Sequence, residues 1–120
     1  MSPLIEQLVE KLRMRLLAQR RELFREVAQI EDELLWLETD VESEMVERAQ
    51  DETFIRLLAR LDDRQKAEIE EIDRALTRIA NGEYGRCEMC KQPIPLARLE
   101  ALPAAAICLP CAQASERTST

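Results

Sequence analysis

Four cysteines near the carboxyl end of the chain have the residue type and the spacing of a metal site. Cys87 and Cys90 form one Cys-x2-Cys pair, and Cys108 and Cys111 form a second pair after a gap of seventeen residues. Each pair can present two thiolates from one tight turn, and two such turns complete the tetrahedron that Zn²⁺ prefers. Four protein ligands leave no coordination position open. We therefore predict one structural zinc ion bound by these four residues.

The same cysteines are open to two other interpretations. The segment Cys108-Leu-Pro-Cys111 has the spacing of a redox dithiol, although no strand–helix pattern of a thioredoxin surrounds it. Four thiolates can also hold an iron–sulfur cluster. No basic and apolar leader follows Met1, so an intracellular location is predicted, where cysteines stay reduced and metal ligation is favoured over disulfides.

The composition excludes several classes of function. The 120 residues contain no His, which excludes His-based acid–base catalysis, Ser-His or Cys-His nucleophiles and His-ligated metals. The net charge is −7, and an acidic protein is a poor partner for the phosphates of DNA or RNA. The longest apolar run, residues 102–109, is too short to span a membrane and contains a Pro.

Gly and Pro divide the chain near Gly82. Neither residue type occurs between Pro3 and Gly82, whereas both Gly and four of the five Pro lie in the last 39 residues. We predict a helical domain over residues 1–82, ended by Asn81-Gly82, and a zinc-finger domain with a short polar tail over residues 83–120. The finger should contain a short helix over residues 96–102, ended by Pro103. Its small core is predicted to consist of Tyr84, Ile94, Leu96, Leu99 and Ile107.

Apolar residues recur at steps of three and four along most of residues 4–81, as in a coiled coil. The stripe runs through Leu4, Leu8, Leu12 and Leu16, then Leu23, Val27, Ile30, Leu34 and Leu37, then Leu58, Leu61, Gln65, Ile69, Ile72, Leu76 and Ile79. Gln65 is a polar position within the second half of this seam. We interpret it as a residue that is tolerated there or that helps to fix the register.

The stripe fails between residues 38 and 51, which suggests a turn. Thr39 with Glu42 fits a capping box, and Asp40 and Ser43 are further candidate caps. A hairpin that turns near residue 45 would place Trp36 opposite Phe54, Ile30 opposite Leu61, and Leu23 opposite Ile69. The predicted fold is mainly α: an antiparallel coiled-coil hairpin with its tip near residues 41–49, then the zinc finger and a C-terminal helix. A single long helix that dimerises is the alternative.

The combination resembles the DksA/TraR family of bacterial regulators. The matching text is Gly82-Glu-Tyr-Gly-Arg-Cys-Glu-Met-Cys90, then Pro93-Ile-Pro-Leu-Ala-Arg-Leu-Glu-Ala-Leu-Pro103, then Cys108-Leu-Pro-Cys111. The resemblance implies a protein that binds RNA polymerase and inserts its hairpin through the secondary channel. It also implies a tip near the catalytic centre that changes the lifetime of promoter complexes.

The resemblance assigns the tip to Glu44, Glu47 and Ala49, where the family carries Asp-x-x-Asp-x-Ala. Both Asp are Glu here, so each carboxylate lies one methylene further from the backbone. Seven of the residues between positions 38 and 52 are acidic and one is basic, which places most of the negative charge where the chain turns. The resemblance also assigns polymerase contacts to Arg60 and Arg64 on the second helix.

The alarmone ppGpp is bound by basic residues in some family members. The corresponding positions here are Glu71, Leu102 and Ala112, none of which can hold a phosphate. We therefore predict regulation with little ppGpp dependence.

We interpret the chain as a cytoplasmic, monomeric transcription regulator that binds RNA polymerase, and not as an enzyme, a DNA-binding protein or a membrane protein. One alternative is a Gre-like accessory factor for transcript cleavage, whose acidic tip helps to hold a second magnesium ion. Another is a dimeric coiled-coil adaptor capped by a structural zinc site. A nucleic-acid-binding finger has little basis, because residues 83–120 hold four basic and four acidic residues.

Overall fold

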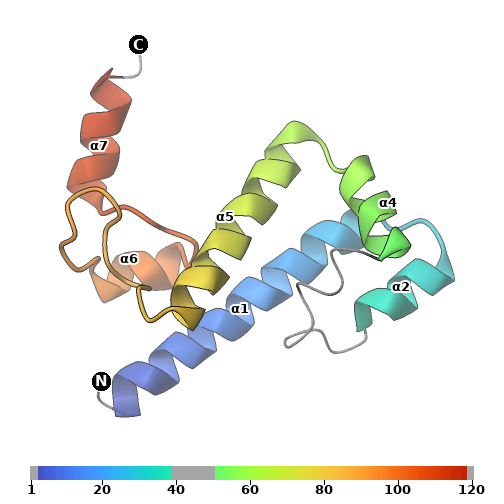
Figure 1. The fold of residues 1–120 in the computed structure, drawn as a ribbon, viewed down its shortest axis with the longest axis horizontal. Coiled ribbons are helices and arrows are strands. Elements are labelled where there is room, and N and C mark those ends of the chain that lie inside the picture. Colours follow the sequence, from blue (N-terminus) through green and yellow to red (C-terminus); the bar gives the residue numbers. More distant parts are fainter. Residues whose placement is uncertain (1–2, 39–50, 119–120) are drawn as a thin grey trace. The chain divides into compact units, whose positions relative to one another are not determined.

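The computed structural model describes residues 3–38 and 51–118, which form six helices in the order shown in Figure 1. These are α1 (Pro3–Val27), α2 (Glu31–Glu38), α4 (Glu52–Arg60), α5 (Asp63–Ala80), α6 (Leu96–Ala101) and α7 (Leu109–Thr118). The described residues contain no strand, only one isolated antiparallel bridge between Arg86 and Pro93. The predicted mainly helical class, with a four-cysteine finger and a C-terminal helix, is confirmed.

None of these helices, within the part of the chain that the structure describes, has the length and apolar content needed to cross a bilayer.

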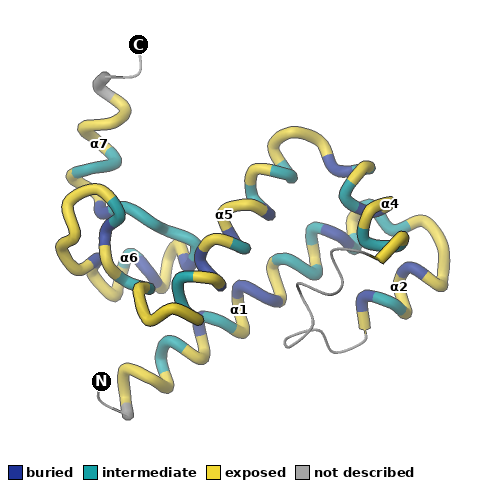
Figure 2. The backbone as a smooth tube through the Cα atoms, viewed as in Figure 1, coloured by how far each residue is buried: buried dark blue, intermediate teal, exposed yellow. Residues whose placement is uncertain are grey.

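The chain divides into two compact units. Unit 1 combines Met1–Leu16 with Glu71–Thr120, and unit 2 is Leu17–Glu70. In each unit, buried positions alternate with exposed ones along the helices (Figure 2). The predicted boundary at Gly82 follows the end of α5, but unit 1 also includes the start of α1 and the second half of α5.

Unit 2 is a helical hairpin in which the chain leaves along α1 and α2 and returns along α4 and α5. The Trp36 and Phe54 rings lie 6.4 Å apart between centroids, which confirms the predicted pairing. Near the other end of the unit, the Gln65 side-chain amide donates to the Glu26 carboxylate at 3.1 Å. The hairpin is therefore confirmed in unit 2, and a single long helix is excluded because α1 ends at Val27. The candidate tip caps Thr39, Asp40, Glu42 and Ser43 lie outside the described residues.

The core of unit 2 is built from five buried side chains: Phe24, Leu37, Leu57, Leu61 and Ile69. Leu23 packs against this cluster, of which Ile69 is a member, together with Trp36 and Phe54. The two residues share one core, and their direct pairing stays a prediction. Ile30 is 51% exposed and does not join the cluster that contains Leu61. The predicted pairing of Ile30 with Leu61 is therefore wrong.

The hairpin differs from the prediction because neither of its arms is one continuous helix. The first arm breaks after Val27 and restarts at Glu31, and the second breaks after Arg60 and restarts at Asp63. Ile30 falls in the first break, which explains its exposure. No Gly or Pro causes either break, so the cause lies in side chains that cap the new helices.

The second break is capped by Asp62 and Gln65. The backbone N–H of Gln65 donates to the Asp62 carboxylate at 2.7 Å, and the backbone N–H of Asp62 donates to the Gln65 side chain at 2.9 Å. This reciprocal pair is a capping box, which satisfies two backbone donors at a helix start. Gln65 therefore has a second role that the apolar period did not indicate: it bonds across the hairpin to Glu26, as a seam residue can, and it also caps the beginning of α5.

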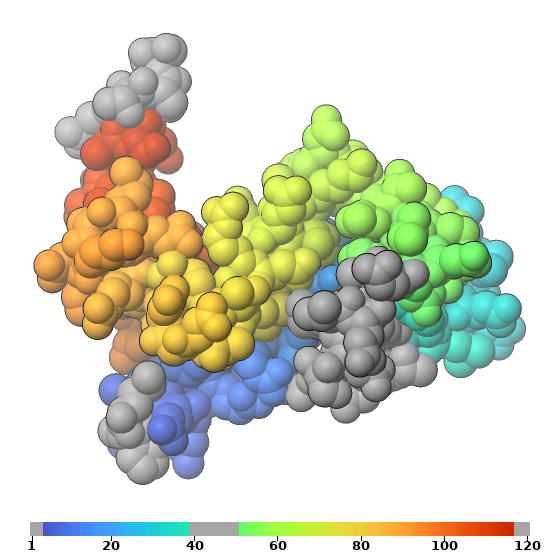
Figure 3. All heavy atoms as spheres, in the orientation of Figure 1, coloured from blue at the N-terminus to red at the C-terminus, as the bar shows by residue number. Residues whose placement is uncertain are grey.

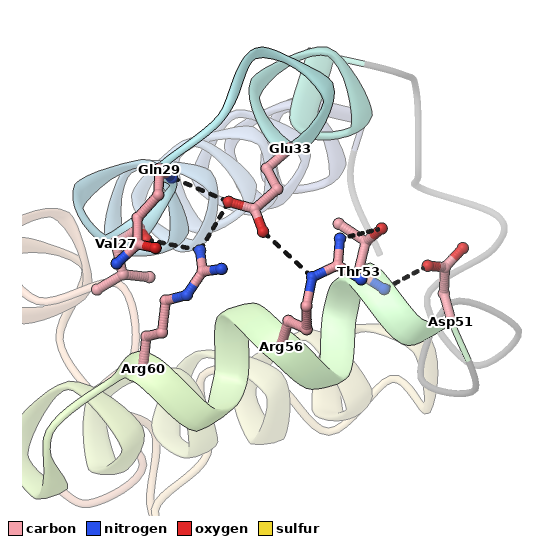
Figure 4. A network of polar contacts seen from close by, with 7 residues as sticks. All are labelled: Val27, Gln29, Glu33, Asp51, Thr53, Arg56 and Arg60. Atoms are coloured by element: carbon pink, nitrogen blue, oxygen red, sulfur yellow. Dashed lines mark hydrogen bonds and ion pairs between the residues drawn. The ribbon is translucent and has the colours of Figure 1, made fainter.

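The first break is organised by Glu33, whose carboxylate is fully buried (Figure 4). It accepts hydrogen bonds from the Gln29 backbone N–H at 2.9 Å, from Arg60 at 2.6 Å and from Arg56 at 3.3 Å. Arg60 also donates to the Val27 carbonyl at 3.1 Å, at the last residue of α1. The Arg60 hydrogen bond is the main cause that lowers the pKa of Glu33 from 4.5 to about 2, and the Gln29 backbone hydrogen bond is the next.

We expect the stability of unit 2 to depend on the ionisation of Glu33. Because its pKa is lower in the folded state, its contribution is complete above about pH 4.5 and is lost as the pH falls toward 2. Thermal unfolding followed by the fluorescence of Trp36 should show this fall in the wild type. Glu33→Gln should have a lower midpoint at pH 7 and a flatter decline below pH 4.5. Glu31→Gln, at an exposed position of the same helix, should keep the wild-type profile, and equal slopes for all three proteins would contradict the assignment.

In unit 1, α5 ends as predicted at Asn81-Gly82. Gly82 has φ +73°, which is the left-handed conformation that glycine adopts without strain. The N–H of Glu83 donates to the Arg78 carbonyl at 2.8 Å, and the N–H of Gly82 donates to the Ile79 carbonyl at 3.2 Å. These two bonds form a Schellman motif, which ends the helix and directs the chain into the finger.

Candidate metal centre

The structure brings the four predicted cysteine ligands together. The sulfur atoms of Cys87, Cys90, Cys108 and Cys111 all lie within 4.8 Å of one another, and those of Cys90 and Cys108 are 3.7 Å apart. A zinc–sulfur bond of about 2.3 Å in tetrahedral geometry places the sulfur atoms roughly 3.8 Å apart. The cluster therefore has the composition and the size of a four-thiolate zinc site.

The first pair of ligands is held in a tight turn. The N–H of Cys87 donates to the Gln92 carbonyl at 2.9 Å, and the N–H of Lys91 donates back to the Cys87 carbonyl at 3.0 Å. Lys91 has φ +67°, and Gly85, which precedes the turn, has φ +89°. The turn aims the Cys90 N–H at the Cys87 sulfur, 3.5 Å away. This arrangement brings both thiols of the pair to one side of the turn.

The second pair of ligands lies at the start of α7. Cys108 immediately precedes the helix and Cys111 lies in its first turn, with the Ala112 N–H donating to the Cys108 carbonyl at 2.9 Å. The two pairs are also joined through the backbone, since the Glu88 N–H donates to the Ala106 carbonyl at 2.9 Å. The helix and this cross-link fix the second pair opposite the first.

The electrostatics of the thiols suit a bound cation. Burial acts to raise the pKa of Cys87, but backbone N–H groups, the Cys90 N–H first among them, outweigh it and lower that pKa to about 6. The pKa of Cys111 is raised to about 12, first by its hydrogen bond with Cys108 and then by burial. Without a metal, adjacent thiols cannot all ionise, because their negative charges repel one another. A divalent cation removes that conflict, and zinc would supply a cross-link between the two pairs.

A small apolar core supports the cluster. Its buried members are Leu12, Ile94 and Leu99 together with the ligands Cys87 and Cys108, and Leu8, Tyr84, Ala105, Ile107 and Cys111 pack against them. Four of the five predicted core residues are present. Leu96 is the exception: it is 53% exposed and lines an apolar cavity of about 300 Å³ instead.

The sequence interpretation missed Leu8 and Leu12 of α1, which contribute to the core of the finger. Their spacing of four was visible, but it was attributed to the coiled-coil seam. Two polar side chains add to this support. The Tyr84 hydroxyl donates to the Pro103 carbonyl at 2.8 Å, and Arg98 donates to the Ile107 carbonyl at 3.1 Å. These bonds tie α6 and the segment after it to the rest of the finger.

The remaining predicted site residues belong to the arm. Glu44, Glu47 and Ala49 lie outside the described residues. Arg64 is on the first turn of α5, with a side chain 89% exposed and 3.6 Å from Glu68. Arg60 is half-buried against Glu33.

A helical hairpin joined to a compact four-cysteine site defines the class of this protein: a small zinc-finger protein with a helical arm. A family model described as the prokaryotic dksA/traR C4-type zinc finger matches residues 82–117. The RNA polymerase-binding transcription factor DksA of Caulobacter vibrioides is 38% identical over 109 residues, which cover 91% of this chain and 76% of that relative. The chain therefore belongs to the DksA/TraR family.

Other relatives agree with this assignment. The RNA polymerase-binding transcription factor DksA of Escherichia coli K12 is 35% identical over 71 residues, 59% of this chain and 47% of that protein. The solved structure of transcription factor DksA2 from Pseudomonas aeruginosa is 32% identical, covers 93% of this chain and 85% of its own, and superposes with a TM-score of 0.59. Membership of this family favours the regulator interpretation over the Gre-like and adaptor alternatives. The C4-type finger match also favours zinc over an iron–sulfur cluster or a redox dithiol.

Proposed function

We propose that this chain is a transcription regulator that acts by binding RNA polymerase. The observation that carries the proposal is its 38% identity, over 91% of its length, to a protein named an RNA polymerase-binding transcription factor. The similarity extends beyond the finger into the helical arm, so the aligned region includes both parts of the molecule. The acidic overall charge agrees with a protein partner more than with a nucleic acid.

The route of action that we propose is insertion of the hairpin through the secondary channel of the polymerase. Within the family pattern, Glu44 and Glu47 would then approach the catalytic centre, and the zinc finger would form the base that fixes the arm. The seven acidic residues from position 38 to position 52 support this proposal, because they concentrate charge in the segment between α2 and α4 and at the helix ends that flank it. Carboxylates there can perturb the groups around a catalytic magnesium ion or the mobile elements beside it.

The two arginines assigned to polymerase contacts are proposed to differ in role. Arg64 is the more accessible of the two. Its side chain is 89% exposed, its ion pair with Glu68 is a surface contact, and the α5 segment that carries it lies at the surface (Figure 3). Arg60 uses its guanidinium to hold Glu33 and the Val27 carbonyl. We therefore propose Arg64 as the direct contact and assign Arg60 first to the hairpin itself.

We also propose that the regulator acts as a cytoplasmic monomer, without enzymatic activity and without binding DNA directly. The equal numbers of acidic and basic residues in the finger support the last point. Regulation should depend little on ppGpp, because the positions that would hold its phosphates are Glu71, Leu102 and Ala112. Glu71 and Leu102 are exposed, and a carboxylate at the first would repel a phosphate.

Multi-round transcription with purified polymerase tests the function and the ppGpp prediction together. Zinc-loaded protein should change the yield from promoters with short-lived open complexes, and adding ppGpp should leave the size of that change nearly the same. Reactions with ppGpp alone provide the control. An unchanged yield at saturating protein would contradict the proposed function, whereas strong synergy with ppGpp would contradict only the prediction of independence.

A further inference from the structure

Arg78 joins the last turn of α5 to the segment that carries the first pair of zinc ligands. Its side chain is only 14% exposed, and its guanidinium makes three polar contacts. One nitrogen donates to the Glu88 carboxylate at 2.9 Å, and the other donates to the Glu83 carbonyl at 3.1 Å and to the Arg86 carbonyl. A planar guanidinium can satisfy several acceptors at once in a fixed geometry.

Two of the residues that Arg78 binds flank a zinc ligand in the sequence. Arg86 immediately precedes Cys87 and Glu88 immediately follows it. The guanidinium holds the first through its backbone carbonyl and the second through its side-chain carboxylate, so it contacts the residues on both sides of this cysteine. Cys87 itself is fully buried. The position of its sulfur therefore depends on the backbone that Arg78 fixes.

We propose that Arg78 is a positioning residue for the zinc site, which presets the first cysteine pair and thereby strengthens the binding of the metal. This inference concerns the metal centre alone and does not rest on polymerase binding. Residues outside the ligand set that orient metal ligands typically change metal affinity by about 10- to 100-fold when they are replaced. The ion pair with Glu88 already balances the charge of Arg78. We therefore assign the influence of Arg78 on zinc binding to the positions of the ligands and not to attraction between its charge and the thiolates.

The test is the competition for zinc between the zinc-loaded protein and a chromophoric chelator, at a temperature where circular dichroism shows full helicity. Arg78→Gln should weaken zinc retention by about 10- to 100-fold. Arg78→Lys should lie between this variant and the wild type, because an ammonium keeps the charge but cannot span all three acceptors. Arg74→Gln, at an exposed position one turn earlier on α5, should retain zinc like the wild type.

A different result is expected if Arg78 stabilises the fold without affecting the zinc ligands. In that case Arg78→Gln would lower the thermal midpoint while the zinc competition curve stayed at the wild-type position, and the proposal would be overturned. If Arg78→Gln does not fold, Arg78→Lys and Glu88→Gln decide the matter in the same assay. Both should lose zinc more readily than the wild type, and wild-type retention in both would contradict the proposal.

Discussion

Removal of zinc is expected to unfold the finger while the hairpin core of unit 2 persists. The finger has few apolar side chains of its own, and two of its ligands, Cys87 and Cys108, are part of its buried core. Zinc binding can supply on the order of 10–16 kcal/mol of apparent free energy to such small sites. Without it, repulsion between adjacent thiolates and loss of the cross-link leave Ile94 and Leu99 with too little support.

Hydrogen exchange of the backbone amides measures this directly. After chelation, or in the Cys108→Ala variant, protection should be lost over residues 83–111 and retained over residues 54–70, which have a separate core. Met89→Ala provides a matched control, because Met89 lies between the ligands of the first pair but is 60% exposed. Full protection of the finger in zinc-free protein would contradict a structural role for the metal.

The second large effect is expected at the proposed tip. Glu44→Ala/Glu47→Ala should abolish regulation of transcription while polymerase binding stays near the wild-type level, because the variant leaves unchanged the arm and the finger, to which we assign the affinity. Charge placed next to a reacting centre acts only when it is closely positioned, so removing two carboxylates there should remove the effect entirely.

A control variant separates the effect of where the carboxylates lie from the effect of the net charge of the protein. Glu6→Ala/Glu70→Ala removes the same number of negative charges at exposed positions far from the tip in sequence, and it should regulate normally. Normal regulation by the Glu44→Ala/Glu47→Ala variant would show that the acidic tip is not the acting element.

The sequence was sufficient to predict the four clustered cysteines and the aromatic pair of the hairpin. Cysteine pairs at this spacing have few alternatives to a metal site, and the four sulfur atoms do lie together. Trp36 and Phe54 were predicted to meet from the position of the turn alone, and their rings are 6.4 Å apart. The spacing within each cysteine pair is local in the sequence. The pairing of the two rings follows from the residue at which the hairpin turns.

The two helix breaks were not predicted, because an apolar period does not reveal where a helix stops. Gln65 has the correct spacing for a seam residue, and only its reciprocal bonds with Asp62 show that it caps α5. Glu33 and Arg60 are 27 residues apart in sequence, so no local pattern could show that they form a buried pair. Side-chain capping and a long-range ion pair therefore accompany the two breaks, in helices that the apolar period predicted to be continuous.

The central claim is that this protein binds RNA polymerase, and a titration measures it most directly. Zinc-loaded protein carrying a fluorescent label on an added terminal residue would be titrated with polymerase core enzyme, and its anisotropy followed. We predict saturable binding with one protein per polymerase, which unlabelled wild type displaces and which zinc removal weakens. No increase in anisotropy at micromolar polymerase, with the finger shown to be folded and zinc-loaded, would contradict the proposed function.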